Sequence, residues 1–295
     1  MKTIIITPFL NEEAVIGDLI KSVISQQLKP TKWVLVDDGS TDKSIQIIQE
    51  LAKDYDWISV LQLDHKTKKR SIGAKIINAF NSGLGTISID DYDIIMKLDA
   101  DLILPENYIK EIAEQFKNNP SIGLCGGVCG LVKQGEVKLE SKTNLDHVRG
   151  ALKAYRKDCF KQIGGLVNRM GWDSVDEYKA RYHNWKVKVI PDLMVAHLKE
   201  TNIKTGHARA SFKNGIMLYT IRFDIPLLMT NVLKRLLWKP YIVQGIAILC
   251  GYFYAFIFRE EKIIDKKLGR FIRKYRYNKI INRILKSDIN NEVNK

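Results

Sequence analysis

The chain has 295 residues, of which 45% are apolar and 27% charged, so it is globular and not disordered. That length allows one sizeable domain with an appendage, or two small domains. The formal net charge of +14 calls for an anionic partner, namely nucleic acid, anionic lipid or a phosphorylated substrate. Four cysteines without a second pair or a nearby histidine do not indicate a zinc site.

The first part of the chain alternates between strand and helix patterns. Strands are predicted at 2–7, 33–36, 59–63 and 94–98, and helices at 14–26, 44–53 and 72–81. This alternation predicts βαβ units in a mostly parallel sheet with helices on both faces. Ligands of such sheets bind beyond the carboxyl ends of the strands. A dehydrogenase of the dinucleotide-binding type fits poorly, because PFLNEE stands where its glycine-rich turn would be.

Polar clusters stand at three of these strand ends: PFLNEE, DDGSTD and LDAD. In LDAD, Asp99 and Asp101 are two residues apart, so in an extended segment both carboxylates point to the same side. Two such carboxylates can face one Mg²⁺ or Mn²⁺ ion, and these ions usually also bind substrate phosphates. Taken alone, each of these clusters also fits an ordinary turn that has no functional role.

From residue 120 to 200 the pattern is mixed, and it includes the segment GWDSVDEYKARYHNW at 171–185. Apolar residues recur there at steps of three and four, which predicts one face of a helix: Val175, Tyr178, Tyr182 and Trp185. The acids Asp173 and Asp176 precede or open this helix. They fit a capping box with Asp173 as the N-cap, and they also fit a catalytic role.

The C-terminal part, 203–295, differs in kind from residues 1–202, and we predict a domain boundary between them. Its run YIVQGIAILCGYFYAFIF, 241–258, fits a membrane-spanning helix, a helix in the membrane interface or a buried soluble helix. Residues 259–295 hold 12 Lys/Arg against 5 Asp/Glu, a surplus of +7. A basic flank beside an apolar run favours a helical, membrane-associating region at the anionic cytoplasmic leaflet. The N-terminus has no signal-peptide pattern.

Taken together, TPFLNEE, VDDGSTD and LDAD resemble the inverting family 2 glycosyltransferases with the GT-A fold, over residues 1–200. The resemblance implies a mixed, mostly parallel α/β sheet flanked by helices. It also implies a set of nucleotide-sugar contacts: Thr7, Pro8, Glu12, Asp38, Arg70, Lys75 and Asp99. In this set Asp38 reads the base and Asp99 lies near the ribose or metal. Asp101 and His197 are the implied metal ligands.

Inverting transfer also needs a base that takes the proton of the acceptor hydroxyl. Many members of the family use the Asp of a Glu-Asp pair that opens a helix. Here Trp172 and Asp173 stand at those positions, so the sequence departs from the usual pair. It resembles instead a subset that reads GWDxxDE, which leaves Asp173 and Asp176 as rival bases.

The expected function is transfer of a sugar from a UDP-, GDP- or dTDP-linked donor to a hydroxyl of a lipid-linked or nascent polysaccharide acceptor. The expected place is the cytoplasmic side, peripheral to or shallowly inserted in the inner face of the cell membrane. One alternative is a polyprenyl-phosphate glycosyltransferase of the same fold, and another is a non-catalytic carbohydrate-binding protein. A basic nucleic-acid-binding protein is disfavoured, because the surplus charge concentrates beside the apolar run.

Overall fold

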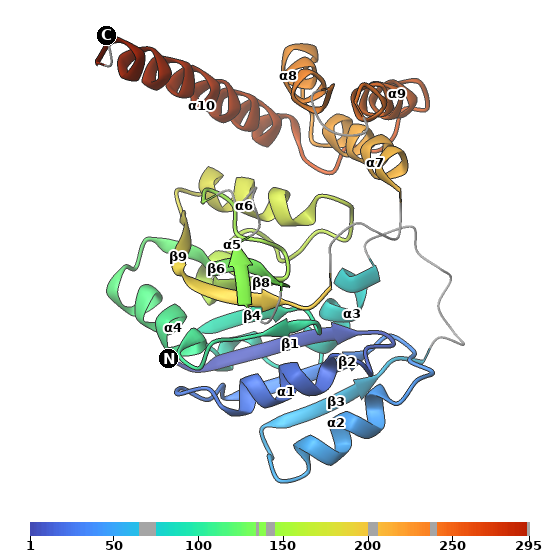
Figure 1. The fold of residues 1–295 in the computed structure, drawn as a ribbon, viewed down its shortest axis with the longest axis vertical. Coiled ribbons are helices and arrows are strands. Elements are labelled where there is room, and N and C mark those ends of the chain that lie inside the picture. Colours follow the sequence, from blue (N-terminus) through green and yellow to red (C-terminus); the bar gives the residue numbers. More distant parts are fainter. Residues whose placement is uncertain (65–74, 134–135, 140–144, 200–205, 237–240, 294–295) are drawn as a thin grey trace. The chain divides into compact units, whose positions relative to one another are not determined.

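A computed structural model of the chain describes residues 1–64, 75–133, 136–139, 145–199, 206–236 and 241–293. The chain divides into two compact units, Met1–Glu200 and Thr201–Lys295 (Figure 1).

The first unit is built on one sheet, which contains nine strands in the described residues. The strands are β1 (Thr3–Phe9), β2 (Lys32–Asp37), β3 (Ile58–Gln62), β4 (Ile94–Leu98), β5 (Leu102–Ile103), β6 (Ile122–Lys133), β7 (Glu136–Leu139), β8 (Leu152–Arg156) and β9 (Lys186–His197). Their order across the sheet is β3-β2-β1-β4-β8-β6-β9-β5, with β7 paired to β6. Strands β3, β2, β1 and β4 run parallel, whereas β8 pairs antiparallel with both β4 and β6.

Helices flank this sheet (Figure 1). They are α1 (Ile16–Ile24), α2 (Ser44–Ala52), α3 (Lys75–Leu84), α4 (Tyr108–Asn118), α5 (Lys157–Gln162) and α6 (Trp172–Tyr182), with a 3₁₀ turn at Ile89–Asp91. Helix α1 shows why they pack: Ile16, Leu19, Ile20 and Val23 recur on one face and are all fully buried. Strand β1 is buried along its whole length, as expected for a strand covered on both faces. The predicted mixed α/β sheet with flanking helices is confirmed.

Helix α6 is shorter than its apolar stripe predicts. It ends at Tyr182, which is exposed, because Asn184 takes a left-handed conformation with φ of 65°. Trp185 therefore lies outside the helix, and its backbone N–H donates to the carbonyl of Ala180 at 2.9 Å. The expected N-cap is also wrong: Gly171, with φ of 85°, occupies that position, and no side chain caps the helix. Asp173 consequently lies inside the first turn.

The second unit is helical in its described residues, with α7 (His207–Thr220), α8 (Ile225–Leu236), α9 (Val243–Ile257) and α10 (Lys266–Val293). Helices α7 and α9 cross at two glycines. A Cβ atom on Gly215 would lie 2.1 Å from the carbonyl oxygen of Ile248, and one on Gly251 would lie 1.9 Å from that of Phe212. The two backbones therefore approach each other more closely than any larger residue allows.

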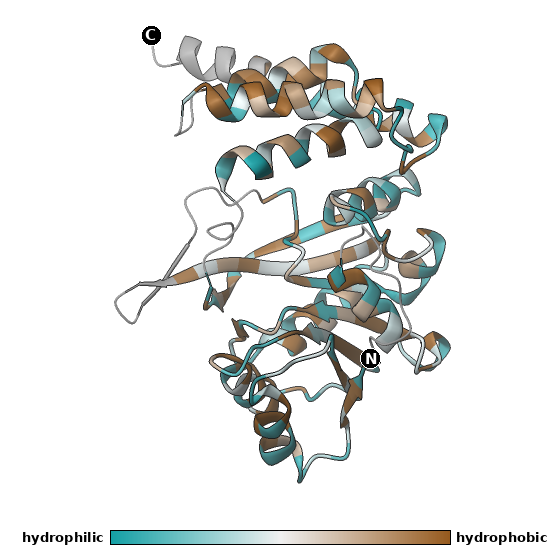
Figure 2. Cartoon of the chain, turned by 90° about the vertical axis from the view of Figure 1, so that its right-hand side faces the viewer, coloured by the Kyte–Doolittle hydropathy of each residue, from teal (hydrophilic) through white to brown (hydrophobic). Residues whose placement is uncertain are grey.

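Many large apolar side chains of this second unit are exposed, and its helices carry hydrophobic stretches in Figure 2. On α8 and around α9 they are Ile225, Met229, Leu233, Tyr241, Ile242, Val243, Ile246, Phe253, Tyr254, Phe256, Ile257 and Phe258. Among the residues that the structure describes, no helix is both long and apolar enough to cross a membrane.

Candidate active site

The carboxyl ends of β1 and β2 are joined by hydrogen bonds between the two segments that follow them. The N–H groups of Asn11 and Glu12 donate to the hydroxyls of Ser40 and Ser44 at 2.9 and 2.8 Å. Asp37 is buried and accepts the N–H of Ser40 at 2.9 Å, which is a local turn contact. These contacts give the edge of the sheet a fixed shape at the point where ligands of such folds bind.

The residues predicted to hold the nucleotide differ in their burial and in their partners. Thr7 and Pro8 are buried strand residues, and the Thr7 hydroxyl accepts the indole N–H of Trp33 at 3.0 Å. Asp38 is half-buried one residue beyond β2. Glu12 forms an ion pair with Lys199, which follows β9. The edge therefore joins the end of β1 with the end of β9.

The structure describes one of the two basic residues predicted to contact the donor. Lys75 is exposed at the first position of α3. Arg70 lies outside the described residues.

The two acids of LDAD have different partners. Asp99 is bonded to the ammonium of Lys97, which is buried within β4 and also donates to the carbonyl of Gly150 at 3.0 Å. Asp101 lies 3.2 Å from the imidazole Nε2 of His197, and β5 pairs Leu102 with His197 to hold the two in register. Burial would raise the pKa of Asp101, but the contact with His197 outweighs it and lowers that pKa. Asp101 is thus a carboxylate at neutral pH.

The Asp101–His197 pair fits a divalent ion. Carboxylate oxygen and imidazole nitrogen are both ligands of Mn²⁺, and the other positions of such an ion are usually filled by water and substrate phosphate. The Nδ1 atom of His197 is buried, and among the described residues it has no hydrogen-bond partner. In the described part of the chain, no group of three or more His, Cys, Asp or Glu residues could hold a metal. Of the described residues, the site therefore offers two ligands, Asp101 and His197.

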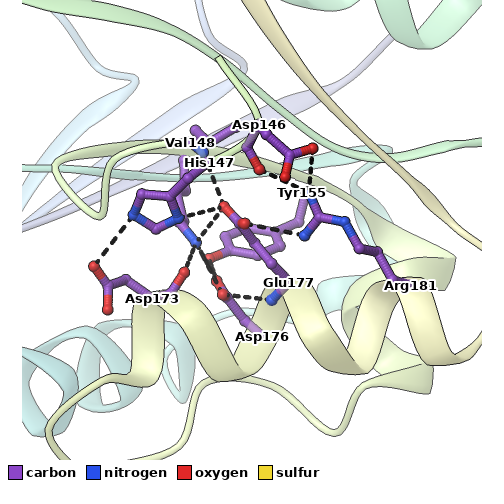
Figure 3. A network of polar contacts seen from close by, with 9 residues as sticks. Asp146, His147, Val148, Tyr155, Asp173, Asp176, Glu177 and Arg181 are labelled. Atoms are coloured by element: carbon purple, nitrogen blue, oxygen red, sulfur yellow. Dashed lines mark hydrogen bonds and ion pairs between the residues drawn. The ribbon is translucent and has the colours of Figure 1, made fainter. Parts of the chain in front are cut away.

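Helix α6 packs over a buried ion cluster centred on Lys153 of β8 (Figure 3). The Lys153 ammonium is fully buried and donates to both oxygens of Asp176, at 2.8 and 2.9 Å, and to Glu177 at 3.2 Å. It also donates to the backbone carbonyl of Asp173. The hydroxyl of Tyr155 donates to the second oxygen of Asp176. One lysine thus holds the first two turns of α6 against the sheet.

This cluster separates the two rival bases. The Asp176 side chain is 0% exposed, and both its oxygens already accept hydrogen bonds. Burial raises the pKa of Asp176 to about 6. The Asp173 side chain is 36% exposed, and burial, which would raise its pKa, is outweighed by His147 and Lys153, so the pKa is lowered. Of the two, Asp173 is the ionised carboxylate that solvent reaches.

Asp99 at the end of β4 and Asp173 of α6 are connected through a short series of contacts. Two buried ammonium groups lie over the ring of Trp172, with Lys97 Nζ 5.3 Å and Lys153 Nζ 5.6 Å from its centroid. A Cβ atom on Gly150 would lie 3.2 Å from the Cβ of Asp173, and Gly150 is also the residue that binds Lys97. Contacts therefore run without a break from Asp99 through Lys97 and Gly150 to Asp173.

Sequence reasoning missed the residues that assemble this site: Lys97, His147, Lys153, Tyr155 and Glu177. A signal was present for the two lysines, since each stands within an apolar strand, in IIMKL and LKAY. A lysine buried in a strand needs a buried anion as its partner. No comparable local signal marks His147.

Two solved structures have a similar fold. A mannosyltransferase from Pyrobaculum calidifontis, in complex with GDP-Man and Mn²⁺, matches with a TM-score of 0.58 and 14% identity, covering 88% of each chain. S. aureus TarS 1–349, in complex with UDP-GlcNAc, matches with a TM-score of 0.57 and 16% identity, covering 88% of this chain and 74% of that one. At such identities the likeness shows the fold alone, and that fold is the GT-A fold of glycosyltransferases.

Residues 4–138 match the family model described as Glycosyl transferase family 2. The poly-beta-1,6-N-acetyl-D-glucosamine synthase of Staphylococcus epidermidis is 29% identical over 117 residues, which are 40% of this chain and 26% of that protein. The synthase of the same name from Staphylococcus aureus strain COL is 28% identical over 117 residues. The match thus spans about a quarter of the length of these curated relatives. Residues 4–138 are thus similar to glycosyl transferase family 2, as the strand-end motifs predict.

Proposed function

We propose that the chain is an inverting, metal-dependent glycosyltransferase that moves a sugar from a nucleotide-sugar donor to a hydroxyl of a glycan or lipid-linked acceptor. One observation carries the proposal. Asp99 contacts Lys97, Lys97 contacts Gly150, and Gly150 lies against Asp173. This observation supports a site in which Asp99, as the proposed donor-binding acid, lies close to the exposed carboxylate of Asp173. The known names of relatives and neighbours favour UDP-N-acetylglucosamine as the first donor to test and GDP-mannose as the second.

In this proposal each side chain has one task. Glu12 and Asp38 contact the nucleoside, and Asp99 contacts the ribose, while Thr7 and Pro8 shape the floor beneath it. Asp101 and His197 hold Mg²⁺ or Mn²⁺, which offsets negative charge on the leaving diphosphate when it is bound. Asp173 accepts the proton of the acceptor hydroxyl as its oxygen attacks the anomeric carbon from the face opposite the diphosphate. The product sugar then has the inverted configuration.

A thermal-shift screen of the whole chain tests the donor and metal sites. We expect UDP-N-acetylglucosamine with Mn²⁺ to raise the melting temperature, because a ligand that binds only the folded state stabilises it by about 2.7 kcal/mol at 100 times Kd. The variant Asp101→Asn should lose the Mn²⁺-dependent part of this shift. The matched variant Asp158→Asn, on α5, should keep it. Retention of the full shift in Asp101→Asn would contradict the metal assignment.

We also propose that the second unit binds the membrane surface through the exposed apolar residues of α8 and α9. Their neighbour in the chain is the basic segment 259–295, whose surplus of +7 attracts anionic lipid. Aromatic and aliphatic residues beside such a segment are typical of helices that lie in the interface plane.

Vesicle sedimentation tests this surface. The triple variant Phe256→Ser, Ile257→Ser and Phe258→Ser should bind anionic vesicles about 100-fold more weakly, since each side chain loses about 1 kcal/mol of apolar transfer. The matched control changes two exposed leucines of the first unit, Leu28→Ser and Leu145→Ser, and should bind as the parent does. Equal sedimentation of the triple variant and the parent would remove this part of the proposal.

A further inference from the structure

Residues Asp146 to Val148 lie along α6 and contact two of its turns (Figure 3). The guanidinium of Arg181 donates to the carbonyl of Asp146 at 2.8 Å, and the N–H of Val148 donates to Glu177 at 2.9 Å. These two contacts fix the backbone on both sides of His147. The position of the imidazole relative to α6 is therefore fixed.

The two ring nitrogens of His147 face two different carboxylates. Nδ1 lies 3.1 Å from Oε1 of Glu177, which is nearly fully buried, and Nε2 lies 3.7 Å from Oδ2 of Asp173. The first distance is that of a hydrogen bond and the second that of an ion pair. A buried acid thus orients the ring, and the ring in turn faces the exposed acid. Proteins commonly orient a functional side chain through a neighbour that is itself held by a further hydrogen bond.

We propose that His147 is the positioning residue of the base: oriented by Glu177 through one nitrogen, it holds the Asp173 carboxylate in place with the other. This inference rests on the proposed function, in which Asp173 takes the acceptor proton. The Oδ2 atom of Asp173 faces His147, and the imidazolium keeps the carboxylate ionised. Nothing in the motif GWDSVDE itself indicates a histidine, so the assignment comes from the three-dimensional contacts alone.

The charges around the ring agree with this role. Burial would lower the pKa of His147, but Asp173 and Glu177 outweigh it and raise that pKa to about 9, against an opposing effect of Lys153 on β8. Among the described residues, the same cluster also holds Asp176 and Arg181 on α6 and Asp146 beside His147 in the chain (Figure 3). Because the folded-state pKa is raised, the stabilisation is full below the unfolded value and is lost as pH rises through about 9.

The test compares the pH profile of kcat for the whole chain with that of His147→Gln, with UDP-N-acetylglucosamine and Mn²⁺ and with UDP release as the readout. Loss of the imidazolium raises the pKa of Asp173, so the acid limb of the profile should move to higher pH. Loss of orientation should lower the plateau kcat about tenfold, with little change in KM for the donor. The matched variant His183→Gln, at the end of α6, should leave the acid limb in place.

An acid limb that stays in place in His147→Gln overturns the inference whatever happens to kcat, because a purely structural role lowers the rate equally at every pH. A second measurement does not depend on turnover or on a change at His147. The imidazole of His147 is titrated by NMR in the parent and in Asp173→Asn, and its pKa should fall in the variant. Unchanged titration also overturns the inference, whereas an inactive parent with a normal fall in this pKa points to failure of the proposed function alone.

Discussion

Replacing Asp173 with Asn should lower kcat for transfer by about 10²- to 10⁴-fold, the range that a general base contributes. The substitution keeps the size of the side chain and removes its ability to accept a proton at neutral pH. Because the side chain is 36% exposed, the fold should be unaffected. Release of the nucleoside diphosphate from the donor, with and without a glycan acceptor, measures the rate, and thermal unfolding checks the fold.

The matched variant is Asp176→Asn on the same helix. Its carboxylate is enclosed by Lys153 and Tyr155, so the change should lower stability, and the folded fraction of the protein should still work. A folded but inactive Asp176→Asn beside an active Asp173→Asn would assign the base to Asp176. Undiminished transfer by both variants would favour the polyprenyl-phosphate alternative, because a phosphate oxygen attacks with little help from a base.

Replacing Lys153 with Met should lower the free energy of unfolding by about 3–5 kcal/mol, the usual cost of leaving buried charge without its partner. The ammonium is the shared donor to Asp176, Glu177 and the carbonyl of Asp173, so all three lose it at once. Urea unfolding followed by circular dichroism measures the change.

The control for this cluster is the double variant Lys153→Met with Asp176→Leu. It removes one of the stranded carboxylates together with the lysine, so it should be less destabilised than Lys153→Met alone. A loss below about 1 kcal/mol in Lys153→Met would mean that water reaches the two acids after all.

The strand-end acids were predictable because each motif is local. A buried strand that runs into PFLNEE, DDGSTD or LDAD specifies both the strand and its polar end within a few residues. The parallel pairing of β1, β2 and β4 then brings these ends to one edge without further information. The contact of Asp101 with His197 depends on the pairing of β5 with β9, and the resemblance to a family, not the local pattern, predicted it.

The cluster around Lys153 was not predictable, because its members come from three segments that no periodicity relates. His147 precedes β8, Lys153 lies within it, and Glu177 belongs to α6. Which of the three acids of GWDSVDE faces water is decided by these tertiary contacts. The first turn of α6 also begins with Gly171 and not with a side-chain cap, which frees Asp173 from the backbone role that its position in the sequence suggests.

The crossing of α7 and α9 at Gly215 and Gly251 has a consequence for the solvent in which the second unit can stay assembled. Contact between two backbones depends on close van der Waals approach and not on the expulsion of water. Such a pair keeps its attraction when the medium around it is hydrocarbon. Helix α9, which carries the exposed Phe253, Tyr254 and Phe256, is therefore joined to α7 by the type of contact that detergent and lipid weaken least.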